Sequence, residues 1–541
     1  MEWRKSLLTI ATLIIFLVLA ARLIDVSLIR GGYYQTLARN NRIRAIPIHA
    51  PRGLILDRNG MPLAQNSQTK KILHFEAGKA ASLIDGQEIK DSENDVAILV
   101  WDRTYPVATV AAHLVGYVGE ATREELGQSE CPNSVYQIGD EIGRIGAESA
   151  FDCLLRGKNG EELVEVDSRG NKVRVLGRRE AQKGQDVKLS IDLFLQQAAA
   201  AALGERKGAV VALNPGTGEI LALVSYPSFD PNNFATNYAS LIANPDQPLF
   251  NRAIGGSYPP GSTFKIVVSA AGLEEGKVDE TTKFTDNGFI QVGTFKYNNW
   301  YFTKYGRTEG EIGIVSAITR STDTFFYKVG EWVGVEKLAE WAKKFGLGAK
   351  TNVELTGETA GIIPTPDWKE RNRGERWFLG NTYHMAIGQG DVAATPLQIA
   401  VMTGIIASGG KKCIPHIMKQ DDLQNFQFPS LKGQASLLSN FQCEDIGLKQ
   451  KTIEVIRQGM IGACSPGGTA GVFFNFKVPV ACKTGTAEFG DDKKKAHAWF
   501  TSFAPAENPE IVVTSIVEGG GEGSSVAAPI TKQVLESYFA N

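Results

Sequence analysis

The N-terminus holds the most apolar segment of the chain. Residues 6–21 carry no charge and consist mainly of Leu, Ile, Ala and Val. As a helix these 16 residues span about 24 Å, short of the roughly 30 Å hydrocarbon core of a bilayer. Further apolar residues extend the segment to Leu28, and Arg22 can reach toward the headgroups. The pattern predicts a single transmembrane anchor over residues 6–28, preceded by a cytoplasmic tail of residues 1–5.

A cleaved signal peptide is the alternative, because Val18-Leu19-Ala20 resembles a small-residue cleavage site. Charge does not decide the orientation: Arg4 and Lys5 precede the segment, but five arginines follow it. We favour a retained anchor, since a large C-terminal mass can be translocated despite such charges.

Short strands and loops are predicted between the anchor and residue 184. Arg52 to Gly60 places an apolar run before an Asn-Gly turn, the pattern of a strand that enters a hairpin. Residues 67–100 show little periodicity, and residues 143–160 predict one helix between glycines, with Leu154 and Leu155 facing inward. We expect a strand-rich pedestal domain over residues 29–184.

A regular succession of strands and helices begins at residue 185. Expected strands cover residues 185–192, 208–214, 219–225, 478–488, 498–504 and 510–518. Expected helices cover residues 193–203, 263–275, 312–346, 396–408 and 448–462, with a last one from about Pro529. Strands at both ends with helices between them predict one α/β (α+β) domain over residues 185–541, whose antiparallel sheet joins its two ends.

Composition narrows the function little. The 541 residues suggest two or three domains, and a net charge of −2 gives no reason to expect nucleic acid. The six cysteines form no CxxC or CxxH motif, which disfavours a zinc site or a thioredoxin-like site. In an oxidising compartment Cys131–Cys153 and Cys413–Cys443 are the candidate pairs, but we favour isolated buried thiols.

The segment Tyr258-Pro-Pro-Gly-Ser262-Thr-Phe-Lys265 carries candidate chemistry. Pro-Pro-Gly blocks a helix and the following residues favour one, so Ser262 lies at a helix start. Residues three apart share a helix face, which brings the Lys265 amine beside the Ser262 hydroxyl as a base. The helix N-terminus also offers N–H groups to an oxyanion. Ser67 and Lys70 have the same spacing in a polar loop without a helix, so the spacing alone is weak.

Two later motifs strengthen the candidate. Lys483-Thr-Gly-Thr486 lies on an expected strand, where Lys483 and Thr484 would hold a terminal carboxylate and the Thr486 N–H would complete an oxyanion hole. Gly485 would let a substrate backbone lie against the strand edge. Between the two motifs, Ser321-Thr-Asp323 precedes a helical stretch.

The order of these three motifs is that of the penicillin-interacting acyl-serine transferases. The resemblance covers nearly the whole chain, including the segments RGLILDRNGMPLAQN, GAVVALNPGTGEILALVSYPSFDPN, NRAIGGSYPPGSTFK, AIGQG and HAWFTSFAP. The chain resembles a class B penicillin-binding protein. Ser321-Thr-Asp323 and Trp377-Phe-Leu-Gly-Asn are similar to its elongation-type branch, penicillin-binding protein 2.

The resemblance implies a peptidoglycan D,D-transpeptidase that cross-links stem peptides ending in D-Ala-D-Ala for elongation and cell shape. Ser262 would be acylated, Lys265 would be the base, and Ser321 would relay the proton to the leaving amine. Asp323, Lys483, Thr484, Gly485 and Thr486 would bind substrate. β-Lactams would acylate Ser262 as covalent inhibitors.

The resemblance implies no cofactor. Some relatives bind zinc in the catalytic domain, but here no His or Cys lies between Ser262 and Tyr383, so we expect no metal. His384 is expected to be a packed loop residue.

A class B enzyme has no glycan-polymerising domain, so the resemblance implies a multi-spanning glycan polymerase as partner. The catalytic domain would stand in the periplasm or outside the cell, anchored in the cytoplasmic (inner) membrane. The region between Asn66 and Gly143 looks short for this branch, so its docking surfaces do not carry over.

Three alternatives stay open. A D,D-carboxypeptidase or a class D β-lactamase uses similar motifs, but the pedestal argues against a soluble hydrolase. A β-lactam sensor would need several membrane spans and a cytoplasmic domain, whereas this chain has one span with five residues before it.

Overall fold

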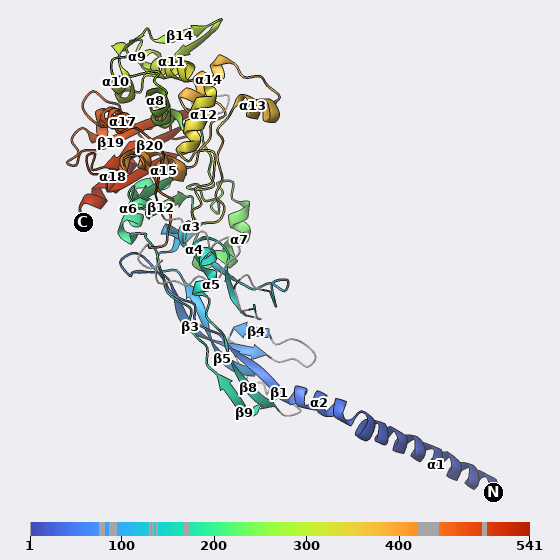
Figure 1. The fold of residues 1–541 in the computed structure, drawn as a ribbon. Helices are drawn as coiled ribbons and strands as arrows, with labels where there is room; N and C mark the ends of the chain where they lie inside the picture. The colour runs from blue at the N-terminus through green and yellow to red at the C-terminus, as the bar shows by residue number, and fades with distance from the viewer. Residues whose placement is uncertain are drawn as a thin grey trace. The chain divides into compact units, whose positions relative to one another are not determined.

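The computed structural model describes residues 2–74, 82–85, 95–128, 131, 135–136, 139–166, 172–419, 443–489 and 495–540 (Figure 1). The chain forms two compact units. The first contains residues 1–53, 66–102 and 156–185, and the second contains residues 54–65, 103–155 and 186–541.

The first unit begins with a long apolar helix. Helix α1 (Glu2–Ile24) continues through a π-helical turn (Asp25–Ile29) and is followed by α2 (Gly31–Arg42). Trp3–Ile29 is the one helix in the described residues that is long and apolar enough to cross a membrane. Asp25 pairs with Arg22 at 2.6 Å and with Arg30 at 3.1 Å, so the negative charge near the end of the segment is compensated by two arginines.

Strands make up the rest of the first unit. Strands β1 (Ile43–Ile48), β8 (Gly160–Val166) and β9 (Lys172–Arg179) form an antiparallel sheet in the order β1-β8-β9. The long strand β3 (Pro62–His74) pairs with β4 (Ser82–Asp85) and β5 (Asp95–Thr104). The expected strand-rich character is confirmed, and β3 to β5 fall where the sequence showed little periodicity.

The hairpin expected at residues 52–60 is present. Strand β2 (Ile55–Leu56) pairs antiparallel with the start of β3 and parallel with β10 (Val187–Lys188). The helix expected over residues 143–160 is wrong: two short helices, α4 (Gly146–Ala150) and α5 (Asp152–Leu155), form instead. Phe151 leaves helical geometry between them, and the Asp152 carboxylate accepts a hydrogen bond from the Gly143 N–H at 2.9 Å. Leu154 and Leu155 are buried, as predicted.

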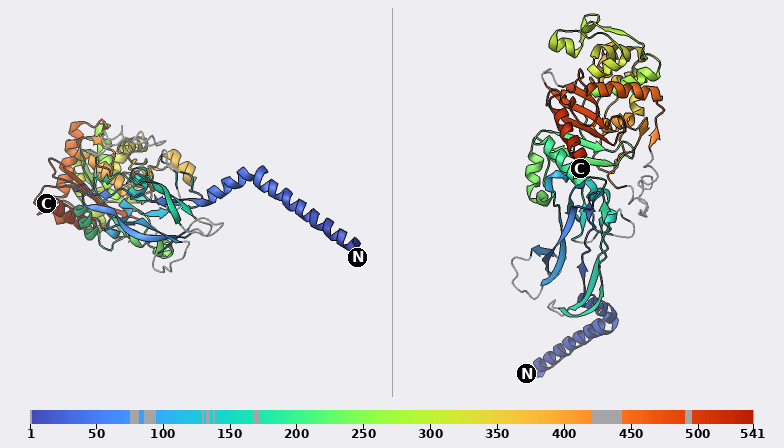
Figure 2. Two further views of the ribbon diagram at one scale, coloured as in Figure 1. Left: turned by 90° about the horizontal axis from the view of Figure 1, so that it is seen from below. Right: turned by 90° about the vertical axis from the view of Figure 1, so that its left-hand side faces the viewer.

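One antiparallel sheet forms the centre of the second unit (Figures 1 and 2). The order of its strands is β12-β11-β21-β20-β19. The strands are β11 (Gly208–Leu213), β12 (Ile220–Tyr226), β19 (Ala481–Glu488), β20 (Ala496–Ala504) and β21 (Ile511–Val517). Strand β11 pairs with β21 along its whole length, so the sheet joins the two ends of the domain as predicted.

Helices cover both faces of this sheet. Alternate residues of β11 belong to different cores: Val210 and Ala212 pack with α6 (Leu193–Leu203) and α18 (Ala527–Ala540), while Ala209 and Val211 pack on the opposite side with α8 (Lys265–Glu274) and α15 (Pro396–Ala407). This alternation is the period of two that a strand imposes, and burial on both faces explains its continuous apolar sequence.

The helical pattern at residues 312–346 resolves into three helices, α10 (Ile314–Arg320), α11 (Asp323–Val333) and α12 (Val335–Lys344). The breaks lie at Ser321, whose φ is 56°, and at Gly334, whose φ is 82°.

The helix expected at residues 448–462 is α17 (Gln450–Ala463). Shorter elements are α3 (Ala112–Val115), α7 (Phe234–Ala243), α9 (Trp300–Tyr305), α13 (Pro366–Arg373), α14 (Leu379–Ala386), β6 (Val118–Glu120), β7 (Glu141–Gly143), β13 (Phe284–Asp286), β14 (Phe289–Val292), β15 (Phe295–Asn298), β16 (Gly310–Ile312), β17 (Lys411–Lys412) and β18 (Glu444–Asp445).

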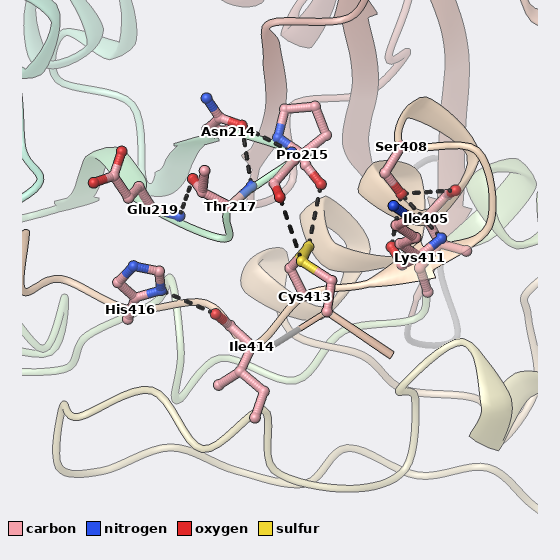
Figure 3. Close-up of a disulfide and its surroundings, with 12 residues drawn as sticks. Asn214, Pro215, Thr217, Glu219, Ile405, Ser408, Lys411, Cys413, Ile414 and His416 are labelled. Atoms are coloured by element: carbon pink, nitrogen blue, oxygen red, sulfur yellow. Dashed lines mark hydrogen bonds between the residues drawn. A yellow bond between two sulfur atoms is a disulfide. The ribbon is translucent and has the colours of Figure 1, made fainter. Parts of the chain in front are cut away.

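All six cysteines form disulfides, so the preference for isolated thiols was wrong. Cys131 pairs with Cys153 and Cys413 with Cys443, the two pairs named as alternatives, and Cys464 pairs with Cys482. Figure 3 shows Cys413, whose sulfur lies 3.3 Å from the Pro215 carbonyl oxygen. The third pair joins the end of α17 to strand β19, two elements whose proximity the sequence did not reveal.

Candidate active site

Ser262 lies in a tight turn that leads into α8. A 3-10 turn (Gly261–Phe264) precedes the helix, which confirms the predicted helix start. Gly261 has a φ of 55°, which glycine adopts without strain, and its N–H donates to the Gly388 carbonyl at 2.8 Å. Gly388 belongs to the AIGQG segment, and a Cβ there would lie 2.2 Å from the Gly261 oxygen. The two glycines therefore fix the turn that carries Ser262, whose neighbours are buried while it is partly exposed.

The turn packs directly on strand β19. A Cβ on Gly485 would lie 2.9 Å from the Trp499 Cβ and 3.0 Å from both the Pro260 oxygen and the Thr263 Cγ2. A Cβ on Gly261 would lie 2.9 Å from the Thr486 oxygen. Glycine at position 485 thus permits the close approach of the turn to the strand. Strand β19 is at the edge of the sheet, where its outer backbone groups face no further strand of the described sheet.

The Lys265 amine is fully buried and points to the Ser321-Thr-Asp323 motif. It donates to the Ser321 carbonyl at 2.8 Å, the Ser321 hydroxyl at 3.2 Å and the Asp323 Oδ1 at 2.6 Å. Within the described residues the Ser262 hydroxyl makes no hydrogen bond. Direct contact between the Lys265 amine and the Ser262 hydroxyl therefore stays a prediction.

The Ser321 hydroxyl lies between two lysines. Besides the Lys265 amine, the Lys483 amine donates to it at 2.8 Å and is itself fully buried. The left-handed conformation of Ser321, at the end of α10, turns its side chain toward both amines. The three sequence motifs therefore converge on one hydroxyl group.

Burial sets the protonation chemistry of the two amines. It lowers the pKa of Lys265, and the nearby Asp323 carboxylate raises that pKa in part. Burial lowers the pKa of Lys483 well below its ordinary value, and the charge of Lys265 lowers it further. A lysine whose pKa is lowered this way is suited to accept a proton from a hydroxyl nucleophile.

Several supporting residues were missed from the sequence. The Asp323 Oδ2 accepts from the Trp300 N–H at 2.8 Å, and the Asp323 N–H donates to the Asn299 Oδ1 at 3.1 Å. Both partners precede the motif by more than twenty residues and form no local pattern with it. A single sequence holds no signal that identifies them.

The hydroxyl groups of Thr484 and Thr486 also have partners that the sequence did not identify. Thr484 donates to the Thr469 hydroxyl at 3.1 Å, and the Gly523 N–H donates to the Thr486 hydroxyl at 3.3 Å. Gly523 lies in the glycine-rich loop that follows β21. This loop lies against β19, since a Cβ on Gly523 would approach the Gly485 oxygen to 2.3 Å.

The second serine–lysine pair lies on a strand. Ser67 and Lys70 belong to β3, so the expected loop was wrong, but the absence of a helix behind them is confirmed. Residues three apart on a strand point to opposite faces, which keeps the Lys70 amine away from the Ser67 hydroxyl. Both residues are exposed, and neither has the surroundings of Ser262.

His384 differs from its predicted setting. It lies on helix α14 rather than in a loop, and it is exposed, with its ring 5.8 Å from that of Tyr297. In the described part of the chain, no group of three or more His, Cys, Asp or Glu side chains is placed to hold a metal ion.

Comparison with protein families identifies two matches. Residues 208–536 match the penicillin binding protein transpeptidase domain, and residues 87–189 match the penicillin-binding protein dimerisation domain. A curated relative, the peptidoglycan D,D-transpeptidase MrdA of Acinetobacter baumannii, is 33% identical over 97% of this chain and 86% of its own length.

Solved structures give the same result over most of the chain. Penicillin-binding protein 2 of Pseudomonas aeruginosa, in complex with WCK 5153, is 34% identical, with a TM-score of 0.73 over 92% of this chain and 97% of its own. Penicillin-binding protein 2 of Helicobacter pylori, in complex with MreC, is 27% identical with a TM-score of 0.78 over 92% and 99%. A chain of a peptidoglycan synthase complex that coordinates polymerization and crosslinking is 31% identical, with a TM-score of 0.75 over 99% and 98%.

Proposed function

The chain belongs to the penicillin-binding protein transpeptidase family, in its class B, elongation-type branch, and from this membership we propose how its residues carry out the reaction. The enzyme is a peptidoglycan D,D-transpeptidase. The observation that carries the proposal is the Ser321 hydroxyl, which contacts the buried amines of Lys265 and Lys483 beside the Ser262 turn.

Acylation begins at Ser262. Neutral Lys265 takes the proton from the Ser262 hydroxyl as its oxygen attacks the carbonyl carbon of the penultimate D-alanine. The N–H groups of Ser262 and Thr486 stabilise the oxyanion, because the Ser262 turn packs on the Thr486 backbone. When the peptide bond breaks, the proton passes from Lys265 through Ser321 to the amine of the departing D-alanine. The products are an ester at Ser262 and free D-alanine.

The second half-reaction reverses the proton path. The amine of a neighbouring stem peptide attacks the ester carbonyl and loses a proton to the Ser321–Lys265 pair. The Ser262 oxygen leaves and recovers its proton from Lys265. A new peptide bond links the two stem peptides, and every group of the enzyme returns to its starting state.

The terminal carboxylate of the donor peptide binds along β19. The hydroxyl groups of Thr484 and Thr486 donate hydrogen bonds to it. Lys483 is fully buried, so its amine does not contact the substrate carboxylate directly. Its charge acts on that carboxylate across the strand and through Ser321. Asp323 holds Lys265, and Gly485 keeps the Ser262 turn against the strand.

Labelled penicillin tests this assignment, since a β-lactam forms the same acyl-serine bond without a leaving group that departs. We expect mass spectrometry to find the label on the peptide that contains Ser262. Label on any other serine of the wild-type enzyme contradicts the proposed route.

We also propose the placement and organisation of the chain. The apolar helix serves as a retained anchor over residues 6–28 in the cytoplasmic membrane, with residues 1–5 in the cytoplasm. Residues 29–184 form the pedestal and residues 185–541 the transpeptidase domain, which acts outside the membrane. The Arg22–Asp25–Arg30 charges at the end of the helix support a boundary with the headgroups there.

Cross-linking needs newly polymerised glycan strands, so we propose a multi-spanning glycan polymerase as partner. The support is the similar chain in a synthase complex that coordinates polymerization and crosslinking. A scaffold of the MreC type is a second partner, supported by the Helicobacter pylori complex. Co-purification of the full-length chain from membranes with either protein tests these assignments.

A further inference from the structure

A second carboxylate, Asp286, lies behind the catalytic cluster and belongs to none of the three motifs. It ends strand β13 and its side chain is buried, with 1% exposed. Its Oδ1 accepts hydrogen bonds from the Gly288 N–H at 2.9 Å and the Thr324 hydroxyl at 2.7 Å. Its Oδ2 accepts from the Asn299 side-chain amide and the Glu309 N–H, both at 2.9 Å. Both oxygens of the carboxylate thus serve as acceptors for two donors each.

Two of these four donors lead to Asp323. The buried Asn299 donates its Nδ2 to Asp286, so its Oδ1 must face the other way, where it accepts from the Asp323 N–H at 3.1 Å. Trp300, the next residue, donates its N–H to the Asp323 Oδ2 at 2.8 Å. Thr324 adjoins Asp323 on α11 and contacts Asp286 directly.

The hydrogen bonds thus form a continuous chain from Asp286 to the base. Asp286 orients Asn299, Asn299 and Trp300 hold the backbone and the carboxylate of Asp323, and the free oxygen of Asp323 contacts the Lys265 amine at 2.6 Å. Every link is buried or partly buried, where such hydrogen bonds are little weakened by water.

We propose that Asp286 is a positioning residue of the transpeptidase reaction, which acts through Asn299 to hold the Asp323 carboxylate against the Lys265 amine. The inference rests on the proposed role of Lys265 as the base. It assigns to Asp286 an effect on the rate and pH dependence of acylation, beyond any contribution to the fold of the segment between β13 and β16.

The pH dependence is informative because few charged groups face the Lys265 amine. Asp323 faces it from α11 and Lys483 faces it from β19. The Phe326 ring, also on α11, lies 5.2 Å away and does not titrate. When Asp323 is held less firmly, its carboxylate raises the pKa of Lys265 less. The acid limb of the pH–rate profile, where the acylation rate falls as Lys265 becomes protonated, then moves to lower pH.

The test compares penicillin acylation rates of the full-length enzyme between pH 5 and 9. It uses two single variants and one double variant in which the residues at positions 286 and 299 are exchanged. Asp286→Asn places an amide where four donors point and leaves two of them without an acceptor. Asn299→Ala leaves Asp286 its hydrogen bonds from Gly288, Glu309 and Thr324 and removes the side chain that bridges Asp286 and Asp323. We expect both to lower the plateau rate constant by about 10- to 100-fold, with the acid limb at lower pH and with a folded protein by circular dichroism.

The double variant and a matched control distinguish an effect on the position of Asp323 from an effect on the stability of the fold. Asp286→Asn combined with Asn299→Asp restores a donor–acceptor pair at the link, so we expect it to recover part of the rate and return the acid limb toward its original position. Asp279, an exposed carboxylate between α8 and β13, also accepts four hydrogen bonds, from the N–H and hydroxyl groups of Thr281 and Thr282. We expect Asp279→Asn to leave the rate and the acid limb unchanged.

The proposal is overturned if Asn299→Ala, while folded, retains the wild-type rate and acid limb. It is also overturned if both variants lose activity only in proportion to the unfolded fraction. Failure of the proposed base is distinguishable, because folded Lys265→Ala would then acylate Ser262 at the wild-type rate.

Discussion

The Lys265 amine and the Asp323 carboxylate form a buried ion pair at 2.6 Å. Two opposing effects act on this lysine: burial lowers its pKa, and the carboxylate raises it. A general base must be neutral to act, so the carboxylate opposes the function of the lysine while it holds the amine in place. The site therefore combines a base with a group that limits its basic form.

Replacement of the carboxylate tests this balance. Asp323→Asn removes the charge that raises the pKa of Lys265, so more of the lysine is neutral at a given pH. We expect an active enzyme whose acylation rate has its acid limb at lower pH, measured with labelled penicillin across pH. Asp367→Asn, an exposed carboxylate in the first turn of α13, is the control and should leave the limb unchanged. A limb at higher pH, or loss of acylation in a folded variant, would show that Asp323 has another role.

The two serine–lysine pairs give a second prediction. Ser262→Ala should abolish labelling by penicillin, and Ser67→Ala should leave it intact, because only the turn of Ser262 leads into the helix of the buried Lys265 and packs on strand β19. The measurement is mass spectrometry of labelled peptides. Label that persists in Ser262→Ala would move the nucleophile elsewhere.

The sheet could be predicted from the sequence because its strands read as continuous apolar runs between turns. The pairing of β11 with β21, more than 290 residues apart along the chain, followed from strands at both ends with helices between them. The strands within residues 67–100 could not be predicted in this way, because β3 to β5 lack the strict alternation of a half-buried strand. The prediction of one helix over residues 143–160 was wrong because Phe151 interrupts it. No glycine or proline in the sequence marks that interruption.

The chemistry of the site could be predicted only where it is local. Ser262 with Lys265, and Ser321 with Asp323, are short motifs whose spacing carries a physical meaning. Asp286, Asn299 and Thr469 act through hydrogen bonds to segments distant in the sequence, and such contacts leave no periodicity or spacing. The pair Cys464–Cys482 was missed for the same reason.

The cysteines give a third prediction. Alkylation of the unfolded but unreduced protein should label no cysteine, and reduction should expose all six. Cys464→Ser with Cys482→Ser should destabilise the domain by about 3 kcal/mol, the value expected for a closed loop of this size. It should also slow acylation, since Cys482 adjoins Lys483 on β19. Alkylated Cys464 or Cys482 before reduction would contradict the pairing.

The N-terminal helix gives a fourth prediction. If it is a retained anchor, the protein extracted from membranes should begin at residue 1 or 2. N-terminal sequencing of the membrane-bound protein decides this. A mature chain that begins at Ala21 or Arg22 would show that the segment is a signal peptide.

The last prediction concerns Gly485. A methyl group there would lie 2.9 Å from the Trp499 Cβ and 3.0 Å from the Pro260 oxygen, both within well-packed surroundings. Gly485→Ala should therefore push the Ser262 turn away from β19, lower the free energy of unfolding by about 1–3 kcal/mol and reduce the acylation rate more than the affinity for penicillin. Gly177, on β9, has no atom within 4 Å of a Cβ placed on it, so Gly177→Ala should change neither quantity. The measurements are thermal unfolding and acylation kinetics at several penicillin concentrations. If Gly485→Ala acylates at the wild-type rate, contact between the turn and the strand does not set the position of Ser262, and the oxyanion site must be built from other groups.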